Sequence, residues 1–182
     1  MVCYTIRNLT HTLNADTLHM VYFAYFQSIL RYGIIFWGNS THVQQVFKLQ
    51  KRVIRIMSGM GLRSSCRNLF KKLRILPVPC QYILSVMLFI IDNQQDFFTN
   101  AHVRGFDTRN KNHLHVPAPS LTCVQKGVSC SGVKIFNGLP SNIQNYKGDR
   151  RKFKKELHKY LTVHSFYSIT EFLECRTNKR NV

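Results

Sequence analysis

Acidic residues are scarce in this sequence. Its 182 residues include eight Asp and Glu against 26 Lys and Arg, which gives a formal net charge of +18. A charge of this size repels itself and weakens the compact state, so the composition indicates an anionic partner. Nucleic acid is the first candidate for that partner, and an anionic membrane surface is the second.

The shortage of carboxylates also bears on catalysis. Metal-dependent nucleotidyl transfer needs clustered carboxylates that hold two cations. Asp92 and Asp96 are four residues apart, a spacing that a solvated helix face also produces. The sequence has no adjacent Asp-Asp pair, no phosphate-binding G-x-x-x-x-G-K-[ST] loop and no G-x-S-x-G nucleophile motif. We therefore predict that the chain is not an enzyme, with no catalytic residue, no cofactor and no small-molecule substrate.

Paired metal ligands are missing as well. The six cysteines are scattered without a C-x-x-C pair, and the only close ligand pair is His113 and His115, with Cys123 and Cys130 downstream and His102 upstream. Structural zinc sites normally use ligands two to four residues apart at both ends. The pattern predicts loop histidines, free thiols and no metal.

The N-terminus also lacks the apolar run of a signal peptide, so an intracellular location, nuclear or cytoplasmic, is expected.

No apolar run is long enough to suggest a membrane span. The longest, "ILPVPCQYILSVMLFII" at residues 75–91, has 17 residues and includes Pro77, Pro79 and Gln81. A spanning helix needs about 20 apolar residues. The run is interpreted as a buried helix over about 80–95, entered at a proline.

The sequence pattern elsewhere is helical. Residues 18–32 are apolar round most of the helix, with Asn14 or Asp16 as the cap and Gly33 as the stop. The next five residues, "IIFWG", predict a short strand or an extended link. A second helix follows over about 42–58, with Thr41 and Gln44 spaced as a capping box. A short third helix, capped by Ser64 or Ser65, ends before Pro77.

The second helix divides into two faces. Its apolar side chains fall in one half of the helical wheel, and its cations fall in the other with Gln44 and Gln45. Only Gln50 breaks the division. The apolar set is Val43, Val46, Phe47, Leu49, Val53, Ile54, Ile56 and Met57, and the cationic set is Lys48, Lys51, Arg52 and Arg55.

The second half of the chain changes character. Residues 96–129 are polar without a helical period, which predicts a long loop with one short strand around "HLHVP". A short helix within 131–140 then has Val133, Phe136 and Leu139 facing inward. The last helix begins at Asp149, with an apolar stripe of Phe153, Leu157, Tyr160 and Leu161, and the tail after it adds one weak turn. The expected architecture is all-α, in four segments: a bundle over 14–96, a link over 97–129, a C-terminal helical segment over 130–174 and a basic tail over 175–182.

Cations recur on three of these helices without acids four residues away. A charge run on a single helix is usually just a solvated face, but recurrence without salt-bridge partners favours contact with phosphates. The predicted nucleic-acid contacts are Lys48, Lys51, Arg52, Arg55, Lys71, Lys72, Arg150, Arg151, Lys154 and Lys155. Five aromatic residues are either part of the core or platforms that stack on bases. They are Phe36, Trp37, Tyr160, Phe166 and Tyr167. The cluster "RRKFKK" is also a weak match to a nuclear import signal.

"YFAYFQSILRYGIIFWGNS" followed by "KLQKRVIRIMSG" resembles the region after the palm of non-LTR retrotransposon reverse transcriptases, particularly jockey-like elements of arthropods. The matching residues are Tyr32-Gly33, Trp37-Gly38, Leu49-Gln50-Lys51-Arg52 and Arg55. "CRNLFKKLRILPVPCQYI", "SGVKIFNGLPSNIQN" and "FKKELHKYLTVHSFYSITEFL" look similar too, so the resemblance covers roughly residues 18–174.

The resemblance implies a thumb, a small helical bundle that grips the template–primer duplex behind the polymerase site. The helix over 42–58 would then face the RNA or DNA backbone. The family's palm, with its Phe/Tyr-Ala-Asp-Asp motif, and its endonuclease are missing here, so no catalytic residue is carried over, and residues 97–182 receive no role. Two alternatives remain: a helical module whose basic face meets an acidic protein, and a transposon remnant without function or stable fold.

Overall fold

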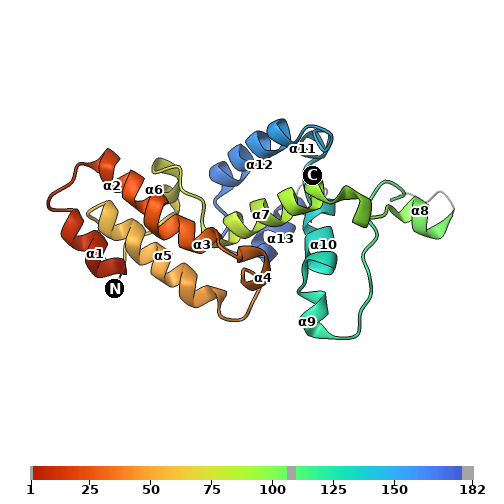
Figure 1. The fold of residues 1–182 in the computed structure, drawn as a ribbon, viewed down its shortest axis with the longest axis horizontal. Helices are drawn as coiled ribbons and strands as arrows, with labels where there is room; N and C mark the ends of the chain where they lie inside the picture. The colour runs from red at the N-terminus through yellow and green to blue at the C-terminus, as the bar shows by residue number, and fades with distance from the viewer. Residues whose placement is uncertain (1, 106–109, 178–182) are drawn as a thin grey trace. The chain divides into compact units, whose positions relative to one another are not determined.

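The computed structural model describes residues 2–105 and 110–177, and in these ranges the protein is all-α (Figure 1). The one pairing of extended residues there is an isolated bridge between Thr99 and Leu114. The predicted fold class is therefore confirmed. The chain forms two compact units, the first made of Met1–Gln81 and Leu161–Tyr167, the second of Tyr82–Tyr160 and Ser168–Val182.

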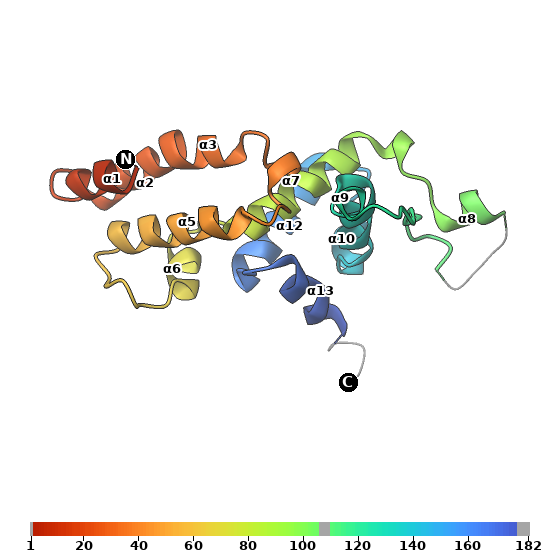
Figure 2. The same ribbon diagram turned by 90° about the horizontal axis from the view of Figure 1, so that it is seen from below.

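Two long helical segments dominate the first unit and run antiparallel beside each other (Figures 1 and 2). One is formed by α2, η1 and α3, and the other is α5. The helices are α1 (Val2–Leu9), α2 (Ala15–Val21), the π-helix η1 (Tyr22–Gln27), α3 (Ser28–Arg31), α4 (Ile34–Trp37), α5 (Val43–Met57), α6 (Arg67–Lys72) and the start of α7 (Val78–Asp92). The sequence pattern did not predict α1, which packs against α5 through the buried Ile6.

The ends of the first long segment follow the sequence. The Asn14 side chain caps α2 by accepting from the Thr17 N–H at 2.8 Å. After α3, Gly33 has a φ of +60°, a left-handed conformation that glycine adopts without the penalty of a Cβ. The predicted strand or extended link at residues 34–38 is wrong. The helical turn α4 forms there because Gly38 N–H donates to Ile34 O and the Trp37 indole N–H donates to Tyr32 O, at 2.7 and 3.0 Å.

The predicted caps of α5 and α6 are also wrong. The N-cap positions are His42 and Cys66, and neither side chain makes a capping hydrogen bond. Backbone turn bonds take over instead, such as the one from Val43 N–H to Ser40 O at 3.3 Å. Consecutive polar residues before a helix therefore indicated where it begins but not which residue caps it.

Gln50 breaks the apolar pattern of α5 because it belongs to a buried hydrogen-bond network. Its amide nitrogen donates to Tyr22 Oη at 3.0 Å and to Leu76 O at 2.9 Å, and its carbonyl accepts from Val78 N–H at 2.9 Å. Val78 is the first residue of α7, whose N–H has no partner inside that helix. Gln50 thereby ties α5 to the entry of α7, whereas Leu49, predicted to face inward, is 39% exposed.

The π-helix η1 extends this network. Tyr22 and Gln27 are five residues apart, the hydrogen-bonding period of a π-helix, and the Tyr22 hydroxyl donates to Gln27 Oε1 at 3.1 Å. The Gln27 amide then donates to Gln81 Oε1 at 2.8 Å. Burial raises the pKa of the Tyr22 phenol above its ordinary value, and the hydrogen bond from Gln50 only partly opposes this rise. The phenol therefore remains a neutral hydrogen-bonding group in the core.

The second unit packs around the remainder of α7. Its other helices are η2 (Gln94–Asp96), α8 (Asn100–Arg104), α9 (Thr122–Gln125), the π-helix η3 (Val128–Gly132), α10 (Val133–Asn137), α11 (Ser141–Gln144), α12 (Arg150–His164, which enters the first unit at Leu161) and α13 (Ile169–Thr177). A Cβ on Gly132 would lie 2.8 Å from Val86 Cγ1, so glycine permits the close packing of η3 against α7. Val133, Phe136 and Leu139 are buried, as predicted.

The C-terminal elements are partly as expected. Phe153, Leu157 and Leu161 of α12 are buried, as the apolar stripe predicted. Asp149 caps α12 by accepting from the Arg151 and Lys152 N–H groups, both at 3.1 Å, and these bonds help to lower the pKa of its carboxyl group. The weak turn expected after α12 is instead the helix α13, held by the buried Phe172.

The link expected over 97–129 contains more structure than a loop. It includes α8 and α9, and the bridge at Leu114 is all that forms of the short strand predicted around "HLHVP". The two compact units divide within α7, between Gln81 and Tyr82, and α7 contributes buried residues to both. Among residues 2–105 and 110–177, no helix combines the length and hydrophobicity that a membrane crossing requires.

Candidate nucleic-acid interface

Cations concentrate on α5, α6 and the connection between them. Residues 48–74 contain nine Lys and Arg and no Asp or Glu. The segments of the first unit together contain eleven cations and one acid, Asp16, which lies in the first turn of α2. These cations therefore have almost no carboxylate available inside their own unit.

Four of the predicted contacts on α5 and α6 are exposed and open. Lys48 and Arg52 lie one turn apart on α5, and Lys71 and Lys72 end α6. Within the described part of the chain, none of the four side chains makes a hydrogen bond or an ion pair. The end of α6 favours cations because the helix dipole is negative there, but no comparable local reason applies to Lys48, near the middle of α5. We refer to these four residues as the open cations.

Lys51 and Arg55 differ from the open cations, although the sequence pattern treated all four cations of α5 alike. Both are half-buried. The Lys51 ammonium lies 4.6 Å from the centre of the Phe47 ring, and Arg55 Nε donates to Ser64 O at 2.8 Å. Neither is neutralised by a carboxylate among the described residues. They add positive charge to the surface, but they also hold α5 against its neighbours.

Tyr167 fixes a second cation beside Lys51. Its ring packs edge-on against Phe47, with the ring centres 5.0 Å apart, while Arg67 Cζ lies 4.4 Å and Lys51 Nζ 5.6 Å from its centre. Cation–π contacts of this kind hold the Lys51 ammonium and the Arg67 guanidinium beside the ring. Arg67, which was not among the predicted contacts, therefore belongs to the candidate surface. Its partner Tyr167, 100 residues away in the sequence, could not be inferred from the pattern.

The aromatic residues considered as base-stacking platforms are mostly occupied by protein contacts. Phe166 is buried, Tyr160 packs against Phe172, and the Trp37 indole donates to Tyr32 O. Tyr167 is covered by the two cations described above. Phe36, which is 91% exposed, is the only one of the five that presents most of its surface to solvent.

Cys66 lies at the centre of this region. Its thiol donates to Lys51 O at 3.6 Å. Burial raises the pKa of the thiol, although the positive charges of Arg55 and Lys51 oppose the rise. The net direction keeps the sulfur protonated near neutral pH, so Cys66 acts as a core residue and adds no negative charge to the cationic surface.

The basic cluster at the start of α12 is partly neutralised. Arg150 makes a bidentate ion pair with Asp92, with N–O distances of 2.5 and 3.0 Å, and Lys152 approaches Asp149 at 3.5 Å. Arg150 therefore has a carboxylate partner, Asp92 at the end of α7, which the sequence pattern did not indicate. Arg151, Lys154 and Lys155 are exposed.

The described residues form no group of metal ligands. No three His, Cys, Asp or Glu side chains among them are grouped as metal ligands. The Cys130 thiol donates to Pro117 O at 3.8 Å, and the side chain of Cys123 lies outside the described residues. Of the two carboxylates considered in the sequence, Asp92 ends α7 and pairs with Arg150, and Asp96 lies in η2.

Comparisons with protein-family models, curated proteins and solved structures found no match to this chain.

Proposed function

We propose that the chain binds RNA or DNA through backbone phosphates, without sequence selection and without catalysis. The observation that carries this proposal is the set of open cations on α5 and α6, together with Lys51 and Arg55 beside them. Cations without carboxylate partners are suited to neutralising phosphates and releasing their counterions. Lys48 and Arg52 make no ion pair with a described residue. This favours a role in phosphate binding over a role in a network of surface ion pairs.

The proposal extends to the origin of the chain. We infer that it is the thumb and post-polymerase part of a jockey-like non-LTR retrotransposon reverse transcriptase, separated from its palm. The inference rests on the resemblance carried by Tyr32-Gly33, Trp37-Gly38 and the basic helix α5. Its test is the genomic DNA upstream of Met1, where palm and endonuclease coding sequence is expected in one of the frames. Unrelated coding sequence there would contradict this origin.

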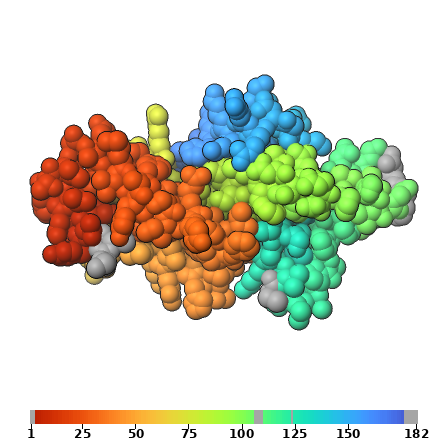
Figure 3. Space-filling view, in the orientation of Figure 1, coloured from red at the N-terminus to blue at the C-terminus, as the bar shows by residue number. Residues whose placement is uncertain are grey.

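Three exposed apolar side chains in and around α3 and α4 support a missing partner. Ile29, Tyr32 and Phe36 are 59%, 87% and 91% exposed, and Figure 3 shows the segment from α2 to α4 on the visible face. Apolar surface of this kind usually marks an interaction site. In the proposed origin, the absent palm would cover it.

Polar substitution of this surface is expected to reduce self-association. Changing Ile29, Tyr32 and Phe36 to Ser should lower light scattering at a given protein concentration and leave the unfolding midpoint almost unchanged, because these side chains bury little surface. Leu30→Ser is the control on the same helix, since Leu30 is 5% exposed and its loss should destabilise the first unit. Unchanged scattering in the triple variant would show that this surface is not responsible for association.

Salt dependence tests the phosphate model directly. Non-specific binding typically has a dissociation constant of roughly 10⁻⁴ to 10⁻⁶ M at physiological salt. We expect a steep linear fall of log affinity with log salt concentration for duplexes of different sequence, measured by fluorescence anisotropy. A salt-independent affinity, or tight saturable binding to an acidic protein with little binding to DNA, would favour the alternative of a protein-interaction module.

A further inference from the structure

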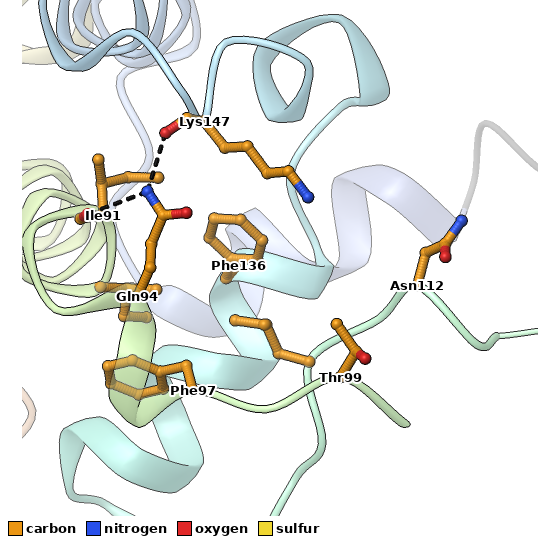
Figure 4. A pocket seen from close by; sticks show the side chains of 9 residues that line it. Ile91, Gln94, Phe97, Thr99, Asn112, Phe136 and Lys147 are labelled. Atoms are coloured by element: carbon orange, nitrogen blue, oxygen red, sulfur yellow. Dashed lines mark hydrogen bonds between the residues drawn. The ribbon is translucent and has the colours of Figure 1, made fainter. Parts of the chain in front are cut away.

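The second unit contains a cavity that backbone binding does not use. Its volume is about 150 Å³, and it lies between the end of α7, α10 and the strand-like residues around Thr99 and Leu114 (Figure 4). The side chains of Ile90, Ile91, Phe97, Leu114 and Phe136 form its apolar walls. A cavity of about this size lined by Leu, Ile and Phe is known to accept benzene, so this one fits a single six-membered ring. A single ring fills this volume, whereas the fused rings of a purine would extend out of its open side.

Gln94 gives the cavity a fixed hydrogen-bond acceptor. Its amide nitrogen donates to Ile91 O at 3.1 Å and to Lys147 O at 3.0 Å, which uses both amide hydrogens. The two carbonyls therefore fix the orientation of the amide, and Figure 4 shows the Gln94 oxygen on the side of Phe136. Among the described residues no group donates to this oxygen, so it is available to an N–H of a bound ring.

Two further polar groups line the same cavity. The Thr99 hydroxyl accepts from the His102 N–H at 3.4 Å and donates to no described group. The amide of the exposed Asn112 lies at the edge. A purely apolar ring would cover the half-buried Thr99 hydroxyl and the Gln94 oxygen without offering either a hydrogen-bond partner. The lining thus favours a ring that carries both hydrogen-bond donors and acceptors.

Lys147 adds a positive charge at the cavity edge. Its side chain extends past Phe136, with the ammonium exposed and without an ion pair in the described part of the chain (Figure 4). No Asp or Glu lines the cavity. A ligand with an anionic group attached to its ring is therefore favoured over a neutral or cationic one.

We propose that this cavity binds a pyrimidine nucleotide, with the base between Phe97 and Phe136 and the phosphate at Lys147. The preference for a nucleotide over other ring-bearing anions rests on the proposed nucleic-acid function. The hydrogen-bonding edge of uracil, thymine or cytosine has an N–H for Gln94 Oε1 and a carbonyl for Thr99 or Asn112. The nucleotide comes from an unstacked position of a single strand or from the free nucleotide pool.

Titration of the full chain with UMP, CMP, AMP and inorganic phosphate, followed by calorimetry, tests this assignment. UMP or CMP should bind at least about tenfold more tightly than AMP, the factor that one well-formed hydrogen bond or one avoided clash supplies. Asn112→Trp places a large ring at the cavity edge and should abolish the preference, and Lys147→Gln should weaken pyrimidine nucleotide binding. Lys134→Gln removes the same charge from α10 outside the cavity and should change nothing.

The outcomes separate this inference from the proposed function. Equal affinity for UMP, AMP and phosphate, unchanged by Asn112→Trp, would overturn the pyrimidine site even if duplex binding through the open cations is intact. Pyrimidine selectivity without salt-dependent duplex binding would leave the site in place and reject the proposed function. Oligo-dT binding more tightly than oligo-dA, lost in Asn112→Trp, identifies a strand as the source, whereas selectivity confined to mononucleotides identifies the free nucleotide. Unfolding midpoints equal to that of the unmodified chain establish that the variants are folded.

Discussion

Changing Lys48, Arg52, Lys71 and Lys72 to Glu is expected to eliminate duplex binding for all sequences alike. The slope of log affinity against log salt is about 0.9 for each phosphate neutralised on B-DNA, so the loss of four contacts should make it shallower by about 3.6. At 0.1 M salt this counterion term corresponds to a loss of affinity on the order of 10³-fold. The four side chains are exposed and make no described interaction, so the fold should persist, which circular dichroism and the unfolding midpoint will check.

A matched pair of double variants separates a specific surface from net charge. Lys48→Glu with Arg52→Glu changes the charge by the same amount as Arg7→Glu with Arg31→Glu, and all four positions are exposed in the first unit. The first pair lies on α5, whereas the second lies on α1 and α3. If α5 contacts the phosphates, the first pair should weaken binding far more than the second. Equal losses would mean that only the overall positive charge attracts nucleic acid, and the assigned surface would be rejected.

Gln50→Leu is expected to cause a large loss of stability, although it replaces a polar core residue by an apolar one. The change leaves Leu76 O and Val78 N–H buried without the Gln50 amide, and Tyr22 loses one of its partners. Two buried unsatisfied groups at about 1 to 3 kcal/mol each predict a loss of about 2 to 6 kcal/mol. This is a large part of the roughly 5 to 15 kcal/mol that stabilises a typical domain. Urea unfolding of the full chain will measure it.

Gln44→Leu and Gln45→Leu are the controls for this prediction. Both residues lie on α5, both are exposed, and neither belongs to the buried network. Surface substitutions of this type usually change stability by less than about 0.5 kcal/mol. A Gln50→Leu variant as stable as these controls would show that the network contributes little, and that a hydrophobic residue at position 50 satisfies the core equally well.

The candidate interface illustrates how far a charge pattern can be interpreted. The spacing of Lys48, Lys51, Arg52 and Arg55 correctly placed these residues on one side of α5, since helical periodicity depends only on the backbone. It did not separate the exposed Lys48 and Arg52 from the half-buried Lys51 and Arg55. That difference arises from Ser64 and Tyr167, which approach α5 from elsewhere in the chain. Likewise, Arg150 seemed open until Asp92, 58 residues away in the sequence, proved to be its partner.

The sequence by itself determined the all-α class, the position of α5, the buried α7 and the inward stripe of α12, because each follows from the local 3.6-residue period and from glycine and proline stops. Only the tertiary structure decided that Gln50 is a core residue, that "IIFWG" forms a helical turn, and which cations stay open. The physical reason is that a polar side chain is buried or exposed according to whether distant groups supply hydrogen bonds or charges, and no local pattern specifies those groups.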